Sequence, residues 1–135
     1  MLRNLLLGHR ARRHWLALFV ALSAATLVVA LLPAERAPDA TGWDKLDHAL
    51  AFGALGVVGV FALRWMRRGV VLLVPLLAAL GAAIELLQAF VPSRRADAAD
   101  FVADVVGAAL GTLLAWWVAR ALEGPVRDES APPPR

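Results

Sequence analysis

The chain has 135 residues, of which 60% are hydrophobic and 19% are charged. Soluble domains are typically about half apolar and a quarter charged, so this composition argues against an ordinary soluble globular protein and against a disordered chain. Cysteine is absent, which excludes thiol chemistry, a cysteine-ligated metal and a disulfide scaffold. The formal charge of +3 does not indicate a nucleic-acid partner, because the 13 arginines and one lysine stand in small groups between apolar runs.

Four apolar segments follow one another along the chain, at residues 15–32, 46–63, 70–91 and 101–119. Each is close to the roughly 20 residues that a helix needs to cross the hydrocarbon core, so each is predicted to be a transmembrane helix. The connections are short, so neighbouring helices run antiparallel. The sequence thus predicts an all-α polytopic membrane protein, a four-helix antiparallel bundle that forms one domain over residues 1–122. The polar, proline-rich segment 123–135 is predicted to be a disordered cytoplasmic tail.

The first apolar segment has an alternative interpretation as a signal peptide. Arg12 and Arg13 precede it and loosely resemble a twin-arginine signal. Its 18 residues exceed the roughly 7–15 apolar residues of a signal-peptide core, however, so we favour a membrane span.

Basic residues are distributed unequally between the two ends of the predicted helices. If the N-terminus is cytoplasmic, ten lysines and arginines flank the inner ends and four flank the outer ends. This asymmetry follows the positive-inside rule and predicts that both termini are cytoplasmic. All five tryptophans fall at predicted membrane interfaces, where an indole N–H keeps contact with water. We expect a multi-pass protein of the bacterial cytoplasmic (inner) membrane.

Acidic residues show the opposite asymmetry, with eight of the eleven at the outer ends. Ionisable residues within a membrane are costly and usually face a bundle interior or an aqueous cavity. Asp44 and His48 are spaced i, i+4 and Glu85 and Gln88 are spaced i, i+3, so each pair shares a helix face. We therefore predict an outward-facing polar cavity lined by helices 46–63, 70–91 and 101–119. The candidate ligand-binding residues are Asp44, Lys45, His48, Glu85, Gln88, Arg94, Asp97, Asp100 and Asp104.

Several of these residues also have structural interpretations. His48 suits a hydrogen bond between helices, Asp44 or Asp100 suits a helix cap, and Arg94 suits an anchor at the membrane interface. Asp104 lies a turn deeper and is harder to explain in this way. Gly107 and Gly111 form a small-residue seam, which predicts a close approach of another helix.

The chain contains no standard catalytic motif: a Gly-x-Ser-x-Gly elbow, a P-loop and a His-Glu-x-x-His pattern are all missing. No residue is therefore assigned as catalytic, although His48 and Glu85 are candidates for an acid and base. One histidine among scattered carboxylates is a weak metal signal, so neither a metal nor another cofactor is predicted.

An ordered set of motifs covers residues 44–111 and resembles the VanZ-like family of small membrane proteins. The motifs are Asp44-Lys45-x-x-His48-x-x-x-Phe52-x-x-Leu55-Gly56, Glu85-x-x-Gln88, Pro92-x-Arg94-x-x-Asp97-x-x-Asp100 and Gly107-x-x-x-Gly111. One departure is Asp104, which stands where the family's pattern has an asparagine on the last helix. The resemblance therefore does not carry over to Asp104 a role that needs an amide donor.

The resemblance implies a function at the cell envelope, because the family's namesake is associated with resistance to the glycopeptide antibiotic teicoplanin. We therefore expect a membrane protein that binds an envelope molecule, with a membrane lipid or an envelope-precursor headgroup as the partner. One alternative is an enzyme that uses His48 and Glu85 on a lipid-linked substrate. Another is a structural or transport component, for which a four-helix chain would need to form a homo-oligomer.

Overall fold

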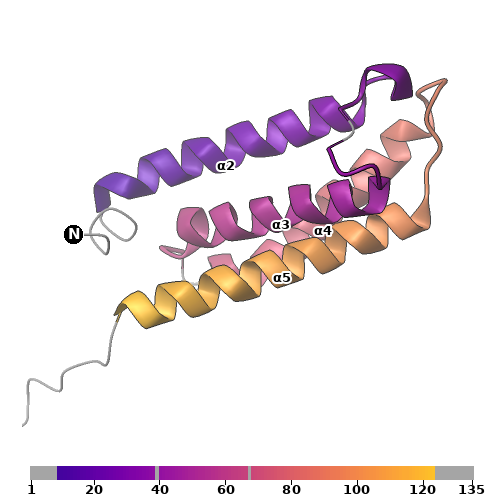
Figure 1. Cartoon of the computed structure of the whole chain (residues 1–135). Coiled ribbons are helices and arrows are strands. Elements are labelled where there is room, and N and C mark those ends of the chain that lie inside the picture. The colour runs from indigo at the N-terminus through magenta and orange to yellow at the C-terminus, as the bar shows by residue number, and fades with distance from the viewer. Residues whose placement is uncertain (1–8, 39, 67, 124–135) are drawn as a thin grey trace, which may run out of the picture.

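The computed structural model describes residues 9–38, 40–66 and 68–123. It contains helix α2 (His9–Ala30), a short 3-10 helix η1 (Ala34–Arg36), and helices α3 (Asp44–Leu63), α4 (Gly69–Gln88) and α5 (Ala98–Glu123) (Figure 1). No strand occurs in these ranges. The predicted tail beyond Glu123 and the N-terminal residues 1–8 lie outside the described residues.

Four helices in the described ranges are long and apolar enough to cross a membrane, which confirms the four predicted spans. The outer surface of the bundle is apolar as well, with Val71, Leu86 and Phe90 between 69% and 84% exposed. Such side chains are unfavourable in water and favourable in lipid. The chain is therefore an all-helical, multi-pass membrane protein.

The helix boundaries differ from the apolar segments by a few residues. α3 and α5 begin before residues 46 and 101, because their first turns are polar and a hydropathy window omits them. α4 ends at Gln88 rather than at 91, since the amides of Phe90 and Val91 bond to carbonyls three residues earlier and form a turn.

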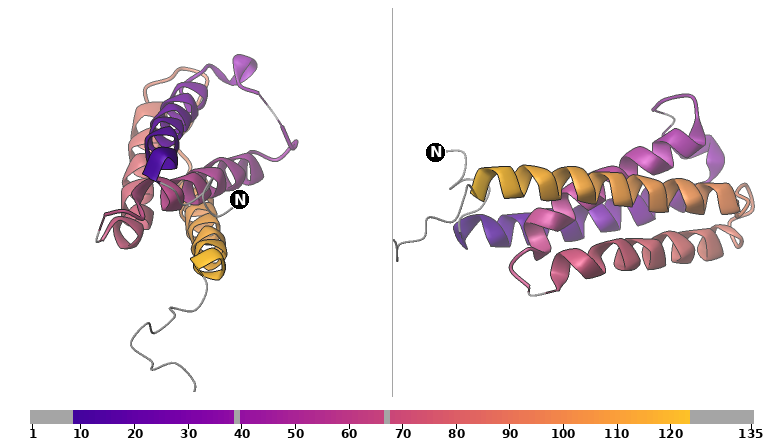
Figure 2. Two further views of the ribbon diagram at one scale, coloured as in Figure 1. Left: turned by 90° about the vertical axis from the view of Figure 1, so that its left-hand side faces the viewer. Right: turned by 90° about the horizontal axis from the view of Figure 1, so that it is seen from below.

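Helix α3 passes obliquely through the middle of the bundle and contacts α2, α4 and α5 (Figure 2). Its closest neighbour is α5. A Cβ atom added at Gly107 would overlap the carbonyl oxygen of Ala49, and one at Gly111 would overlap that of Gly53. The two backbones therefore touch along the small-residue seam, which brings the first turns of α3 and α5 together.

The core lies where α3 meets α4. Phe52, Leu55, Leu73, Leu77 and Ile84 are each at most 1% exposed. These side chains recur at spacings of three, four and seven residues on their helices, as expected for one buried stripe. They hold the end of α4 beside the start of α3.

Helix α2 is peripheral, and its side chains contact the core at intervals along its length. Among its side chains that the structure describes, Phe19 alone is buried. Trp15 stacks on Phe61 of α3 with 5.0 Å between ring centroids. Near the other end, the Gln88 side chain donates to the Ala30 carbonyl at 3.0 Å. These contacts favour a resident helix over the signal-peptide alternative.

Candidate functional site

The antiparallel order places the start of α3, the end of α4 and the start of α5 at the same end of the molecule (Figure 1). Most of the predicted site residues stand in these three turns. The structure therefore brings together side chains that are up to 60 positions apart in the sequence, from Asp44 to Asp104. Their hydrogen bonds fall into three groups.

Lys45 links α3 to the start of α5. Its Nζ donates to Asp97 Oδ2 at 2.7 Å and to Asp100 Oδ1 at 2.8 Å. Asp97 also caps α5, since its Oδ1 accepts the Ala99 N–H at 2.8 Å. The hydrogen bond from Lys45, followed by the one from Ala99, lowers the pKa of the Asp97 carboxyl below its usual value of 3.8.

The sequence interpretation of Asp44 or Asp100 as a helix cap is wrong for both residues. Asp97 caps α5, whereas Asp100 lies in the first turn and pairs with Lys45. Asp44 is the first residue of α3, and the residue in the N-cap position is Trp43, which makes no capping side-chain bond. Asp44 thus has an exposed carboxylate rather than a capping one.

His48 pairs with Asp104 across the seam between α3 and α5. The His48 Nδ1 and Asp104 Oδ1 atoms are 2.9 Å apart. Asp104 is fully buried, and its Oδ2 has no hydrogen-bond partner. A Cβ at Gly81 of α4 would lie 2.8 Å from this Oδ2, so the glycine makes room for the carboxylate.

Glu85 and Gln88 share a helix face but bond in different directions. Glu85 Oε2 accepts the Asp97 N–H at 2.7 Å, and its Oε1 is buried without a partner. Gln88 is 3% exposed and donates to the Ala30 carbonyl of α2. Glu85 therefore belongs to the polar cluster, whereas Gln88 ties α4 to α2.

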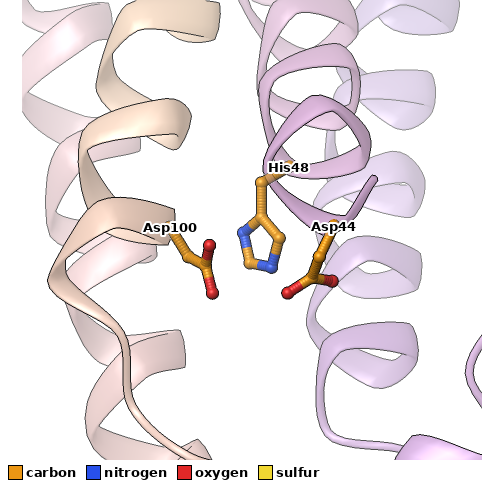
Figure 3. Close-up of side chains that lie close together, drawn as sticks. All are labelled: Asp44, His48 and Asp100. Carbon is orange, nitrogen blue, oxygen red and sulfur yellow. The ribbon is translucent and has the colours of Figure 1, made fainter. Parts of the chain in front are cut away.

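The imidazole of His48 lies between carboxylates. Figure 3 shows the imidazole ring between the carboxylate groups of Asp44 and Asp100. Two sets of three side chains hold ligand atoms within 4.8 Å of one another, and both include His48. The sets are Asp44, His48 and Asp100, and His48, Glu85 and Asp104. Imidazole and carboxylate are common ligands of divalent cations, so this arrangement is able to hold one.

A cavity of about 530 Å³ adjoins the cluster. Leu22, Thr26 and Val29 of α2 form one wall, and Ala51 and Phe52 of α3 form the facing wall. Its polar end carries Asp44, Asp47, His48 and Arg94. The cavity thus joins an apolar interior to a charged end.

The position of this cavity differs from the expectation that helices 46–63, 70–91 and 101–119 would line it. Of the predicted ligand-binding residues, Asp44, His48 and Arg94 line it. Lys45, Glu85, Asp97, Asp100 and Asp104 instead bond to one another or to His48, and hydrogen bonds that involve an ionised group are short and strong. The apolar residues of α2 that wall the cavity carry no motif that distinguishes them from lipid-facing residues.

A model of the VanZ/LLP1 family matches residues 4–119. The chain belongs to the VanZ/LLP1 family. This confirms the resemblance drawn from residues 44–111. Comparisons of this VanZ/LLP1 protein with curated proteins and with solved structures gave no match. The family match includes α2, so the helix that walls the cavity is part of the family domain.

The opposite end of this VanZ/LLP1 protein has a different composition. Arg64 pairs with Glu123, and Arg120 lies 5.0 Å from the ring centroid of Trp116. A smaller cavity of about 310 Å³ is lined there by Arg64, Trp116 and Arg120, among others. Arginine and tryptophan are the usual residues of a membrane interface, so this end requires no ligand to explain it.

Proposed function

We propose that this VanZ/LLP1 membrane protein binds an amphiphilic molecule of the cell envelope in the cavity between α2 and α3. The observation that carries the proposal is the composition of the cavity, which is apolar along the helices and charged at one end. Its volume of about 530 Å³ lies within the usual range of ligand sites, roughly 300–1,000 Å³. An acyl or prenyl chain fits the apolar part, with the headgroup at the charged end.

The charged end favours a zwitterionic headgroup. Asp47 Oδ2 accepts the Ala40 N–H, whereas its Oδ1 is buried without a partner and suits an ammonium group. Arg94 Nε donates to the Leu32 carbonyl at 3.1 Å, which fixes the guanidinium at the cavity wall. A guanidinium in this position suits a phosphate or carboxylate.

The binding experiment compares two single-chain lipids in detergent, lysophosphatidylethanolamine as the zwitterion and lysophosphatidylglycerol as the anion. We expect the zwitterion to bind at least tenfold more tightly. Ala51→Phe fills the cavity and is expected to abolish binding, whereas Leu50→Phe lies on the exposed side of α3 and is the matched control. Arg94→Ala is expected to weaken binding. Equal binding by the Ala51→Phe and wild-type proteins would refute the proposed site.

We further propose that the protein lies in the cytoplasmic membrane of a bacterium, with the polar cluster facing outward and both termini in the cytoplasm. The distribution of lysine and arginine supports this orientation. The chain has no native cysteine, so in Ala96→Cys and Met66→Cys a thiol reagent labels the introduced cysteine alone, each at one end of the bundle. A membrane-impermeant thiol reagent is expected to label position 96 and not position 66 in intact cells. The reverse pattern would place the cluster in the cytoplasm.

The link to glycopeptide resistance is the final part of the proposal, and family membership supports it. Expression in a teicoplanin-sensitive strain is expected to raise the inhibitory concentration of teicoplanin. The Ala51→Phe variant is expected to lose this effect, whereas Leu50→Phe keeps it. If both variants lose the effect, or both keep it, resistance does not depend on the cavity.

The enzyme alternative receives less support from the geometry. It requires His48 and Glu85 to act on one substrate. Their ligand atoms lie within 4.8 Å of each other, but His48 lines the cavity and Glu85 does not. An acid and a base need hydrogen-bond reach of the same substrate. Turnover of a lipid-linked substrate that is lost in Glu85→Gln would revive this alternative.

A further inference from the structure

We propose that His48, Glu85 and Asp104 form a binding site for one divalent transition-metal ion, such as Zn²⁺ or Mn²⁺. The site lies where α3, α4 and α5 meet. One ligand atom from each side chain lies within 4.8 Å of the other two. Metal–ligand bonds of about 2.0–2.2 Å place two ligands of one ion up to roughly 4.4 Å apart, so small side-chain rotations bring all three into range.

Two buried oxygens without partners point to a bound cation. Asp104 is 0% exposed, and its Oδ2 accepts no hydrogen bond. Glu85 is 8% exposed, and its Oε1 accepts no hydrogen bond either. A buried polar atom without a partner costs about 1–3 kcal/mol, and more when it is charged. A cation between the two carboxylates satisfies both oxygens at once.

The charges of the cluster lead to the same conclusion. Lys45 is the one lysine of the chain, and both Asp97 and Asp100 already bond to its Nζ. In the described ion pairs, Glu85 has no cationic partner, and the partner of Asp104 is His48 rather than a lysine or arginine. With His48 neutral and both carboxylates ionised, as metal ligation requires, the two carboxylates match the charge of one divalent ion.

The inner set of ligands is favoured over the outer set, in which Asp44 and Asp100 accompany His48. Asp100 is already paired with Lys45, and Asp44 is exposed to solvent. The inner carboxylates are buried, and the Asp97 N–H holds Glu85 Oε2 in place. In the ion-bound form, His48 exchanges its hydrogen bond to Asp104 for a bond to the ion.

The ligand types select among cations. One imidazole nitrogen with two carboxylate oxygens suits Zn²⁺ or Mn²⁺ better than Mg²⁺ or Ca²⁺, which prefer oxygen ligands throughout. His48 also lines the cavity, so an ion has a route to the site and water is able to complete its coordination from that side. This inference stands apart from the proposed function, because it requires no lipid ligand.

The first experiment measures ion binding to the purified full-length protein in detergent, with Mn²⁺ and Zn²⁺ salts as the probes. We expect one ion per chain. Glu85→Gln and Asp104→Asn preserve side-chain shape and are expected to weaken binding at least tenfold. Glu123→Gln is the matched control at the other end of the bundle and is expected to leave the ion affinity unchanged. Asp44→Asn, in the outer set, is also expected to leave it unchanged.

The second experiment tests directly whether His48 binds the ion. Pulsed electron paramagnetic resonance of bound Mn²⁺ is expected to show coupling to a ¹⁴N nucleus, which disappears in His48→Gln. Bound Mn²⁺ without nitrogen coupling would overturn the proposal, as would millimolar Mn²⁺ and Zn²⁺ failing to bind. Loss of affinity in Asp44→Asn but not in Glu85→Gln would also overturn it by moving the ion to the outer set. Where a variant does not fold, the wild-type spectrum decides.

Discussion

The interfaces that α3 forms with α5 and with α2 differ in how closely they are packed. Against α5, glycines at 107 and 111 bring the backbones into contact, and no side chain fits between them. Against α2, Trp15 and Phe19 pack on the core, and a cavity of about 530 Å³ lies beside the second half of α2. A tight interface fixes the polar cluster in position, whereas a loose one leaves space that a ligand can fill. The protein thus separates the part that determines its stability from the part suited to binding.

The largest expected effect comes from breaking the tight interface. Gly111→Leu places a side chain where the Gly53 carbonyl lies, so α3 and α5 must move apart. We expect a loss of about 3 kcal/mol or more in stability, or failure to fold, because this seam has no space to adjust. Ala109→Leu on the exposed side of α5 is the control. Thermal unfolding in detergent measures both, and equal melting temperatures would show that the seam is not limiting.

A smaller loss is expected from removing the cation of the cluster. Lys45→Met leaves Asp100, which is 5% exposed, without the ion pair that neutralises it. We expect Tm to fall, though by less than in Gly111→Leu, since the Lys45 side chain is partly exposed to solvent. Lys45→Arg keeps the charge and is expected to restore most of the stability. A Lys45→Met protein as stable as wild type would contradict this role.

The loose interface is expected to respond more weakly. Gln88→Leu removes the bond to the Ala30 carbonyl, which costs about 1 kcal/mol. The effect should be local, because α2 keeps its contact between Trp15 and Phe61. Hydrogen exchange is expected to quicken at residues 30–36 and to stay unchanged in α5. Faster exchange throughout the bundle would show that α2 is more strongly coupled than its contacts indicate.

The smallest expected effect is a dependence on pH at the exposed edge of the cluster. The pKa of Asp97 is lower in the folded protein than its usual value of 3.8, so its pairing with Lys45 stabilises the fold above that value. The contribution is lost as the pH falls through the lowered pKa. The difference in Tm between wild type and Asp97→Asn is therefore expected to stay constant from about pH 7 to pH 5 and to shrink below about pH 4. A difference that grows on acidification would contradict the pairing.

Much of the fold was predictable because the membrane imposes a simple local rule. A segment of about 20 apolar residues must be a helix in lipid, since its backbone has no other hydrogen-bond partners there. The antiparallel order then places the polar residues around His48, Glu85 and Asp104 at one end, as the sequence predicted. The helix ends were less predictable. The start of α5 is set by the Asp97 cap, which lies in a polar stretch that a hydropathy window does not include in the span.

The candidate site was predictable as a set of residues but not as an arrangement. The sequence shows that His48, Glu85 and Asp104 lie at similar depth, and one histidine among scattered acids indicated no metal. Whether their side chains meet depends on how each helix is rotated about its axis, and this rotation is set by Gly107 and Gly111 against α3 and by Gly81 beside Asp104. Residue spacing within one helix carries no information about the rotation of another.

The sequence by itself thus determined the four spans, their order and the end at which the charges gather, because hydropathy and charge act residue by residue. The tertiary structure alone decided that Lys45 pairs with Asp97 and Asp100, that Glu85 and Asp104 are left with unpartnered oxygens, and that α2 walls the cavity. These features depend on distances between helices. Such distances arise from packing, in which a single glycine permits contact between backbones and an incompletely packed interface leaves a cavity.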